Sequence, residues 1–202
     1  MLAKQTMLVK ERFYRFVFKI FFVFFLLFSY SLNLIAKEKE SIINRLLEIN
    51  NFTFNFEQTI QGKTETGTCF LVFDNKLKCI YADKNQKEII INKKTLVVIK
   101  KRYDKIYFYP ISKSPFLKIL NKNSLINLVR ESNLELNNNI DLVYFDKNGK
   151  KITVFFEKKS YDLIGWEIED KFQNEIYFTL KIKNKNTEID NDLFKIPSKI
   201  KE

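Results

Sequence analysis

The chain has 202 residues, of which 35 are Lys or Arg, 24 are Asp or Glu and none is His. Without histidine there is no Ser-His-Asp arrangement and no imidazole metal site, and the four glycines form no phosphate-binding loop, so the sequence predicts neither a cofactor nor most kinds of enzyme. Lys, Asn, Ile and Phe are frequent, a bias that an AT-rich genome produces by itself, so the net charge of +11 is weak evidence for an acidic partner. A solvated, mildly basic exterior and attraction to anionic lipid head groups are the two interpretations of this charge.

The first 36 residues have the pattern of an export signal. A basic stretch that ends at Lys19 precedes an unbroken apolar run at residues 20–28, and a polar section then leads to Ala36. We predict a signal peptide, residues 1–36, cleaved after Ala36, which leaves residues 37–202 as a single domain with a net charge of +7. Leu34 stands where a small residue is preferred, so an uncleaved anchor is the alternative, although residues 20–36 fall short of the ~20 residues of a comfortable span.

The exported part begins with a predicted helix. Ser41 is the expected N-cap, and the helix should end by Asn50 and Asn51, because apolar residues recur at helical spacing at Ile42, Ile43, Leu46, Leu47 and Ile49. The period then changes to two. Phe52, Phe54 and Phe56 alternate with polar residues, which predicts a strand with one buried face.

Two series of short strands follow, separated by helices. The first is a meander at residues 67–73, 77–82, 88–91, 95–100 and 105–109, after which residues 115–129 suit one or two short helices. The second begins near Ile140, at residues 142–145, 152–157, 165–170 and 175–183. About nine strands cannot form a flat sheet, so we predict a mainly β (α+β) fold: a strongly curved antiparallel sheet or incomplete β-barrel with an N-terminal helix and short lid helices. An ordinary core and a sheltered cavity under these helices both fit the pattern.

Two residue pairs are candidates for chemistry. Cys69 and Cys79 flank a predicted turn and share parity, so a disulfide and two unpaired cysteines on an apolar face are equal alternatives. Glu167 and Glu169 share a strand face, as an acid/base pair would. Alternating charges on the outer face of a strand usually only keep it soluble, so we predict a binding protein that is not an enzyme.

Four motifs occur in the same order as in a known family. Residues 52–58 fit F-x-x-x-F-x-Q after an amphipathic helix, and Gly67 with the residues up to 81 fits a G-x-L-x-hydrophobic hairpin. Residues 114–116 fit a small-Pro-hydrophobic helix start, and residues 186–197 fit a terminal N-x-x-I…F-x-hydrophobic-P pattern. Over nearly the whole exported part, the sequence therefore resembles the LolA family of periplasmic outer-membrane lipoprotein carriers.

One site departs from the family pattern. An Arg-Pro pair normally precedes the turn of the family's hairpin, and that arginine is thought to hold the helical lid closed, whereas Phe73 and Asp74 occupy the matching positions here. Cys79 also replaces the aromatic residue that is usual in the following strand. The resemblance therefore does not carry over the lid mechanism.

The resemblance implies a half-barrel in the periplasm that shelters the acyl chains of lipoproteins, or related lipids, between the inner and outer membranes. It implies an inner-membrane lipoprotein-release complex and an outer-membrane acceptor as partners. We also predict a monomer that binds no nucleic acid, because export removes the protein from most nucleic acid and the sequence has no basic helix or aromatic-basic motif of a known nucleic-acid module. The alternative is a lipoprotein- or lipid-sensing module in envelope signalling that transports nothing. Each residue of the predicted cavity has an ordinary core position as its alternative; the set is Phe54, Phe56, Cys69, Leu71, Phe73, Leu77, Cys79, Ile176, Phe178 and Leu180.

Overall fold

A computed structural model describes residues 35–73, 75–111, 116–147, 149–169 and 173–197. Nearly all of the predicted signal segment lies outside these residues, as do Asp74, Ser114 and Pro115 of the family motifs. Within the described part of the chain, no helix combines the length and the apolar character needed to cross a membrane. Residues 35–40 are helical, and the compact unit Ser41–Glu202 contains all the strands of the described residues.

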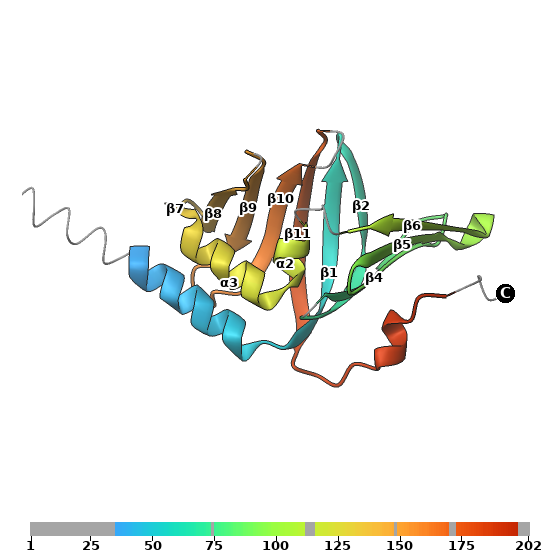
Figure 1. Cartoon of the computed structure of the whole chain (residues 1–202), viewed down its shortest axis with the longest axis horizontal. Coiled ribbons are helices and arrows are strands. Elements are labelled where there is room, and N and C mark those ends of the chain that lie inside the picture. The colour runs from blue at the N-terminus through green and yellow to red at the C-terminus, as the bar shows by residue number, and fades with distance from the viewer. Residues whose placement is uncertain (1–34, 74, 112–115, 148, 170–172, 198–202) are drawn as a thin grey trace, which may run out of the picture. The chain divides into compact units, whose positions relative to one another are not determined.

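Eleven strands in the described residues form one antiparallel sheet (Figure 1). Their spatial order is β6-β5-β4-β3-β2-β1-β11-β10-β9-β8-β7, so β6 and β7 are the two edges and the sheet does not close. This confirms the predicted mainly β fold with an open sheet. The strands are β1 (Asn51–Ile60), β2 (Lys63–Val72), β3 (Lys76–Tyr81), β4 (Lys87–Asn92), β5 (Thr95–Lys100), β6 (Lys105–Pro110), β7 (Asn133–Leu136), β8 (Ile140–Phe145), β9 (Lys151–Phe156), β10 (Leu163–Glu169) and β11 (Glu175–Lys185).

Helices cover one face of this sheet, which we call the inner face (Figure 1). They are the helical residues 41–48, α2 (Phe116–Leu120) and α3 (Lys122–Glu131), and the Asn121 side chain caps α3 by accepting a hydrogen bond from the Ser124 N–H at 2.9 Å. A short 3-10 helix, η1 (Lys101–Tyr103), lies between β5 and β6, and a second, η2 (Asn191–Phe194), follows β11.

Period-two alternation places the core on the inner face. Phe52, Phe54 and Phe56 of β1 are buried, while Thr53, Asn55 and Glu57 between them are not. These phenylalanines and Phe178 of β11 belong to the same buried cluster as the apolar residues of the helices. A sheet with one face covered by amphipathic helices needs this arrangement, because the alternate residues of each strand point to opposite faces.

Asp162, between β9 and β10, ties the first helix to the sheet. Its carboxylate accepts a hydrogen bond from Arg45 Nε at 2.8 Å and another from the Lys185 ammonium of β11. Burial alone would raise the pKa of this carboxyl, but the hydrogen bonds from Lys185 and Arg45 outweigh burial and lower the pKa below its ordinary value.

The predicted elements differ from the structure at three places. Ser41 does not cap the first helix, because residues 35–40 are already helical. Residues 37–40 are Lys and Glu, whose unbranched side chains favour a helix. The second strand begins at Lys63, four residues before Gly67. The sheet also contains β7, whose four residues follow α3 so closely that no separate apolar pattern marks them.

Candidate functional site

An apolar cavity of about 170 Å³ opens on the inner face. Its walls come from six strands, β1, β3, β4, β5, β10 and β11, and from Phe116 of α2. The strands therefore form the floor and sides, and the helical layer supplies one wall. The lining residues are Phe54, Gln58, Leu77, Cys79, Tyr81, Ile89, Ile91, Leu96, Phe116, Trp166, Ile168, Ile176 and Phe178.

Stacked aromatic rings connect the helical wall of the cavity to the centre of the sheet. The Phe116 ring lies 5.2 Å from Trp166, whose indole stacks on Phe178 at 4.2 Å between ring centroids. Phe178 in turn stacks on Phe56 at 5.1 Å, and the edge of Tyr81 meets Phe56 at 4.9 Å. Aromatic pairs at these separations attract beyond the burial of their area, so this row of rings is a well-packed wall.

Gly67 of β2 leaves space for the Phe56 ring. A Cβ atom at Gly67 would lie 2.7 Å from Phe56 Cε1 and 2.2 Å from the carbonyl oxygen of Ile80, closer than real Cβ contacts come. The absent side chain lets the ring lie against the strand. The glycine of the hairpin motif thus has a packing reason in this structure.

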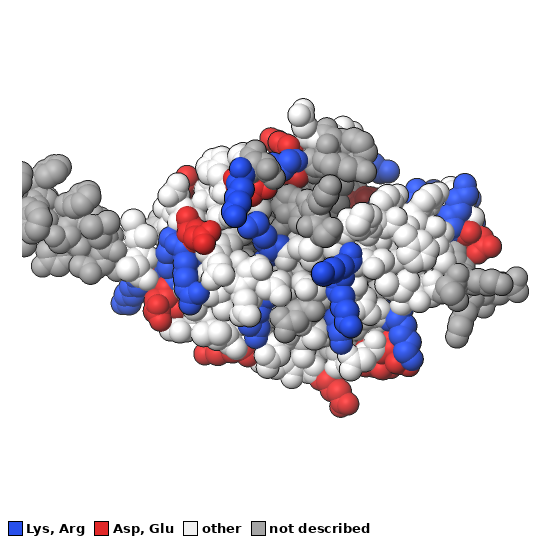
Figure 2. Space-filling model, in the orientation of Figure 1, with Lys and Arg blue, Asp and Glu red and all other residues white. Residues whose placement is uncertain are grey.

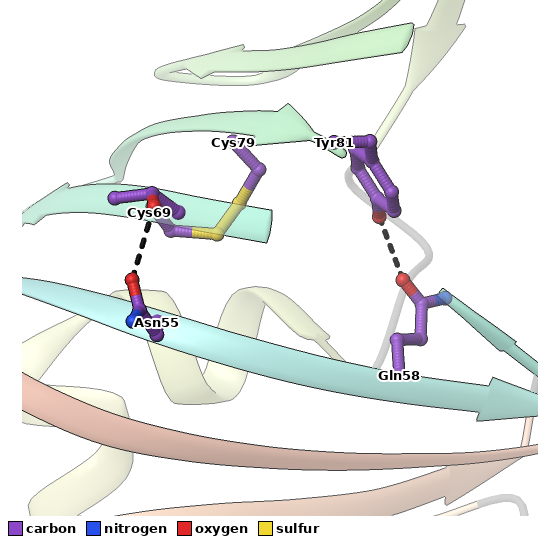
Figure 3. The surroundings of a disulfide bond; sticks show 6 residues. Asn55, Gln58, Cys69, Cys79 and Tyr81 are labelled. Atoms are coloured by element: carbon purple, nitrogen blue, oxygen red, sulfur yellow. Dashed lines mark hydrogen bonds between the residues drawn. A yellow bond between two sulfur atoms is a disulfide. The ribbon is translucent and has the colours of Figure 1, made fainter. Parts of the chain in front are cut away.

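A polar pair lies in the cavity wall (Figure 3). The Tyr81 hydroxyl donates a hydrogen bond of 2.6 Å to Gln58 Oε1, and the two side chains point toward each other from neighbouring parts of the sheet. Burial strongly raises the pKa of Tyr81, with a smaller contribution from Glu65 and Asp83, so the phenol stays protonated and remains a donor. The Lys87 ammonium lies 3.7 Å from the Tyr81 ring centroid.

Cys69 and Cys79 face each other directly in the β2–β3 register and are joined by a disulfide (Figure 3). The half-cystine Cys79 lines the cavity, whereas Cys69 is fully buried behind it. The bridge links β2 to β3, which lines the cavity, so it restrains the sheet beside the cavity.

The structure brings all ten predicted cavity residues to the inner-face core, but they divide into two sets. Phe54, Leu77, Cys79, Ile176 and Phe178 line the cavity itself. The other five are buried in the surrounding cluster without lining the cavity, and they are Phe56, Cys69, Leu71, Phe73 and Leu180.

Eight lining residues were not among the predicted ones. Trp166 and Ile168 of β10 alternate with glutamates, so alternation in this strand was a usable signal. Ile89 and Ile91 of β4 lie on either side of the buried Ile90, so this strand has no alternation that marks its cavity face. Gln58 is the last residue of the motif at residues 52–58 and shares a face with Phe54. The three remaining residues, Tyr81, Leu96 and Phe116, are placed by strand pairing and helix packing.

Phe73, where the family pattern has arginine, contacts the helical layer in a different way. The ammonium of Lys122, at the start of α3, lies 5.4 Å from the Phe73 ring centroid and donates a 3.0 Å hydrogen bond to Asn50 Oδ1. The Asn75 N–H also donates to the Leu120 carbonyl at 3.4 Å. Here the cation belongs to the helix and the aromatic ring to the sheet.

The candidate acid/base pair is engaged in ion pairs. Glu167 Oε1 lies 3.7 Å from Lys151 Nζ, and Glu169 Oε1 lies 3.3 Å from Lys150 Nζ. Among the described residues there is also no group of three or more His, Cys, Asp or Glu placed to hold a metal ion. The two carboxylates therefore lie beside lysines and outside the cavity.

Comparison with known proteins identifies the family of this fold. The family model described as outer membrane lipoprotein carrier protein LolA matches residues 48–197. The chain belongs to the LolA family. The matched residues include every residue that lines the cavity, together with the disulfide and α2 and α3.

One curated relative of this LolA-family chain is the outer-membrane lipoprotein carrier protein of Campylobacter jejuni subsp. jejuni serotype O:2, which is 25% identical over 153 residues, or 74% of this chain and 82% of the relative. Among solved structures, a chain of the Pseudomonas aeruginosa MucA/MucB complex has a TM-score of 0.46 at 11% identity, covering 80% of this chain and 62% of that one. Lipoprotein LppX of Mycobacterium tuberculosis has a TM-score of 0.46 at 12% identity, covering 78% of this chain and 98% of LppX.

Proposed function

We propose that this LolA-family protein is a periplasmic carrier, and not an enzyme, that holds an acyl chain of a lipoprotein or related lipid during transit from the inner to the outer membrane. The observation that supports the proposal is the apolar cavity on the inner face. Small-molecule sites are typically concave and apolar with a few placed polar groups, and here the Gln58–Tyr81 pair supplies the polar groups.

The proposed carrier is a monomeric domain of residues 37–202 without a cofactor, released by cleavage after Ala36. It would receive cargo from an inner-membrane lipoprotein-release complex and deliver it to an outer-membrane acceptor. The curated relative bears the name of an outer-membrane lipoprotein carrier, which supports this direction of transport.

The cavity volume limits how much of an acyl chain is covered in this conformation. An engineered cavity of about 150 Å³ in another protein's core binds benzene, so a cavity of about 170 Å³ accommodates roughly six carbons. At about 0.8 kcal/mol per buried methylene, six carbons contribute about 5 kcal/mol, whereas a sixteen-carbon chain offers about 12 kcal/mol. Full shelter therefore requires the helical layer to shift.

The decisive experiment is to purify the protein from an envelope extract of its host and to analyse the bound material by mass spectrometry. We expect acylated lipoprotein or lipid at up to one equivalent, and transfer of that cargo from donor to acceptor vesicles. Repeated absence of bound acyl groups would reject the carrier. Stoichiometric co-purification of a partner protein, with cargo bound but never transferred, would instead assign a sensing module to the same cavity.

A further inference from the structure

Exposed aromatic residues concentrate at the β6 edge of the sheet. Of ten large hydrophobic side chains that are exposed in the described residues, four lie within seven residues of sequence. They are Tyr103, Tyr107, Phe108 and Tyr109, with exposed fractions of 52%, 37%, 57% and 44%. Single exposed apolar residues are ordinary, but several exposed rings along one edge of a sheet mark an interaction surface. Tyr107 and Tyr109 point to the inner face, whereas Phe108, the partner of Val97, points to the other face of the same edge.

Part of this group continues the face that carries the cavity. Leu96 of β5 lines the cavity, and its cross-strand partner in β6 is Tyr109. The next inner-face pair is Val98 with Tyr107. Paired residues of an antiparallel ladder point to the same side, so Tyr107 and Tyr109 extend the apolar inner face from the cavity to the edge of the sheet.

Basic side chains accompany the rings. Lys100 and Lys105 form the following cross-strand pair, and Lys100 Nζ lies 5.8 Å from the Tyr107 ring centroid. The Arg102 guanidinium lies 6.0 Å from the ring of Tyr103. Figure 2 shows a broad uncharged area over the end of the molecule that carries β5 and β6, with charged side chains at its margin.

A buried ion pair holds the η1 end of this surface in place. Glu88 of β4 is buried and receives the ammonium groups of Lys101 at 2.5 Å and Lys78 at 3.1 Å. Lys101 is thus occupied by the scaffold, and the Arg102 N–H donates to the Asn85 carbonyl at 3.3 Å. The rings and the three remaining cations are therefore presented on a fixed edge.

We propose that Tyr103, Tyr107, Phe108 and Tyr109, with Lys100, Arg102 and Lys105, form a docking surface for an anionic lipid bilayer. Tyrosine rings favour the boundary between head groups and acyl chains, and each Lys or Arg near an anionic leaflet adds attraction. Pairing of β6 with a second copy is disfavoured by Pro110, which has no N–H to donate.

If the protein is the proposed carrier, the position of this surface gives it a role in moving the acyl chain between membrane and cavity. A bilayer in contact with Tyr107 and Tyr109 lies beside the cavity, so an acyl chain passes between membrane and cavity with little exposure to water. Binding to the bilayer itself needs no cargo. Failure of the envelope extraction would reject the carrier and leave the docking surface standing.

The test titrates the full exported protein with vesicles that contain anionic phosphatidylglycerol and with neutral phosphatidylcholine vesicles. Co-sedimentation measures the partition coefficient, and hydrogen exchange of the β6 amides gives a local readout that the N-terminal segment does not affect. We expect preference for anionic vesicles, weaker but measurable binding at high salt, and slower exchange in β6 on binding. The triple variant Lys100→Gln, Arg102→Gln, Lys105→Gln should bind roughly 100-fold more weakly, at about fivefold for each charge.

Matched controls carry the same changes elsewhere. Lys63→Gln, Lys181→Gln, Lys183→Gln removes three exposed charges from β2 and β11 and should bind like wild type. Tyr107→Thr with Tyr109→Thr should weaken binding even at high salt, whereas exposed Tyr177→Thr should not. Any of three results would overturn the proposal. The two charge triples could lose binding equally, or exchange in β6 could stay unchanged in the presence of vesicles. The third is a dimer that the Tyr107 and Tyr109 changes dissociate while vesicle binding persists.

Discussion

Substitution of Leu96 by tryptophan tests whether the cavity binds the acyl chain. Leu96 lines the cavity from β5, so an indole in its place should occupy much of the 170 Å³ space. If about six carbons bind there, the loss approaches 5 kcal/mol, or between about three and four orders of magnitude in Kd. Thr95→Trp places the same ring on the neighbouring residue, whose side chain points to the other face.

The assay is displacement of a fluorescent fatty acid by saturated fatty acids of increasing length. For wild type, each added methylene should strengthen binding by about 0.8 kcal/mol until the cavity is full, after which the increment falls. Leu96→Trp should lose the steep part of this dependence, and Thr95→Trp should keep it. Urea denaturation checks that the variant is folded, since overpacking costs about 1–3 kcal/mol. A folded Leu96→Trp protein with wild-type affinities at every chain length would refute the assignment of this cavity.

Three further predictions concern the restraints around the cavity. Reduction of the Cys69–Cys79 bridge, at a sequence separation of 10, should lower the free energy of unfolding in urea by about 3 kcal/mol, and an unchanged midpoint would contradict this. The pKa of Asp162 is lowered by its two basic partners, so its contribution to stability is present above the unfolded value of about 3.9 and is lost as the pH falls through the folded pKa. Asp162→Asn should therefore reduce the acid-induced drop in melting temperature below pH 4, and an unaltered drop would count against the ion pairs. Lys122→Met keeps an apolar side chain but removes the ammonium group that lies over the Phe73 ring and donates to Asn50. The contact with Phe73 is worth about 0.5–1 kcal/mol, so its loss should make release of bound lipid to vesicles up to about fivefold faster. An equal release rate would exclude a role for Lys122 in lid closure.

The sheet was predictable because its signal is local. In β1 and β11 the alternation of apolar and polar residues fixes which face is buried, and it needs no knowledge of the partner strand. The opposed cysteines follow from the same parity once the turn register is known. By contrast, β7 escaped prediction because four residues next to a helix carry too little pattern.

The cavity was predictable only in part, because its walls meet through pairings distant in sequence. Phe54 lies opposite Ile182 across the β1–β11 ladder, and β10 pairs with the other side of β11. These two pairings bring β10 into the same sheet as the β1–β2 hairpin, although the two are more than 90 residues apart in sequence. The alternation of β10 marks Trp166 as inward-facing, but its place in this cavity depends on the β1–β11 and β10–β11 registers, which join strands distant in sequence. Phe116 reaches it through the packing of α2, which depends on the tertiary structure.

The distribution of restraints indicates which wall would move to admit a longer chain. The strand walls are held by ladder hydrogen bonds and by the Cys69–Cys79 bridge, so widening them would break several bonds together. On the helical side, the five-residue α2 contributes Phe116, and the junction with α3 is attached to the sheet by the Lys122 contacts and one backbone hydrogen bond. A sixteen-carbon chain offers about 7 kcal/mol beyond the portion that fits the present cavity. Under the proposed function, this surplus favours displacement of α2 and α3 while the sheet keeps its register.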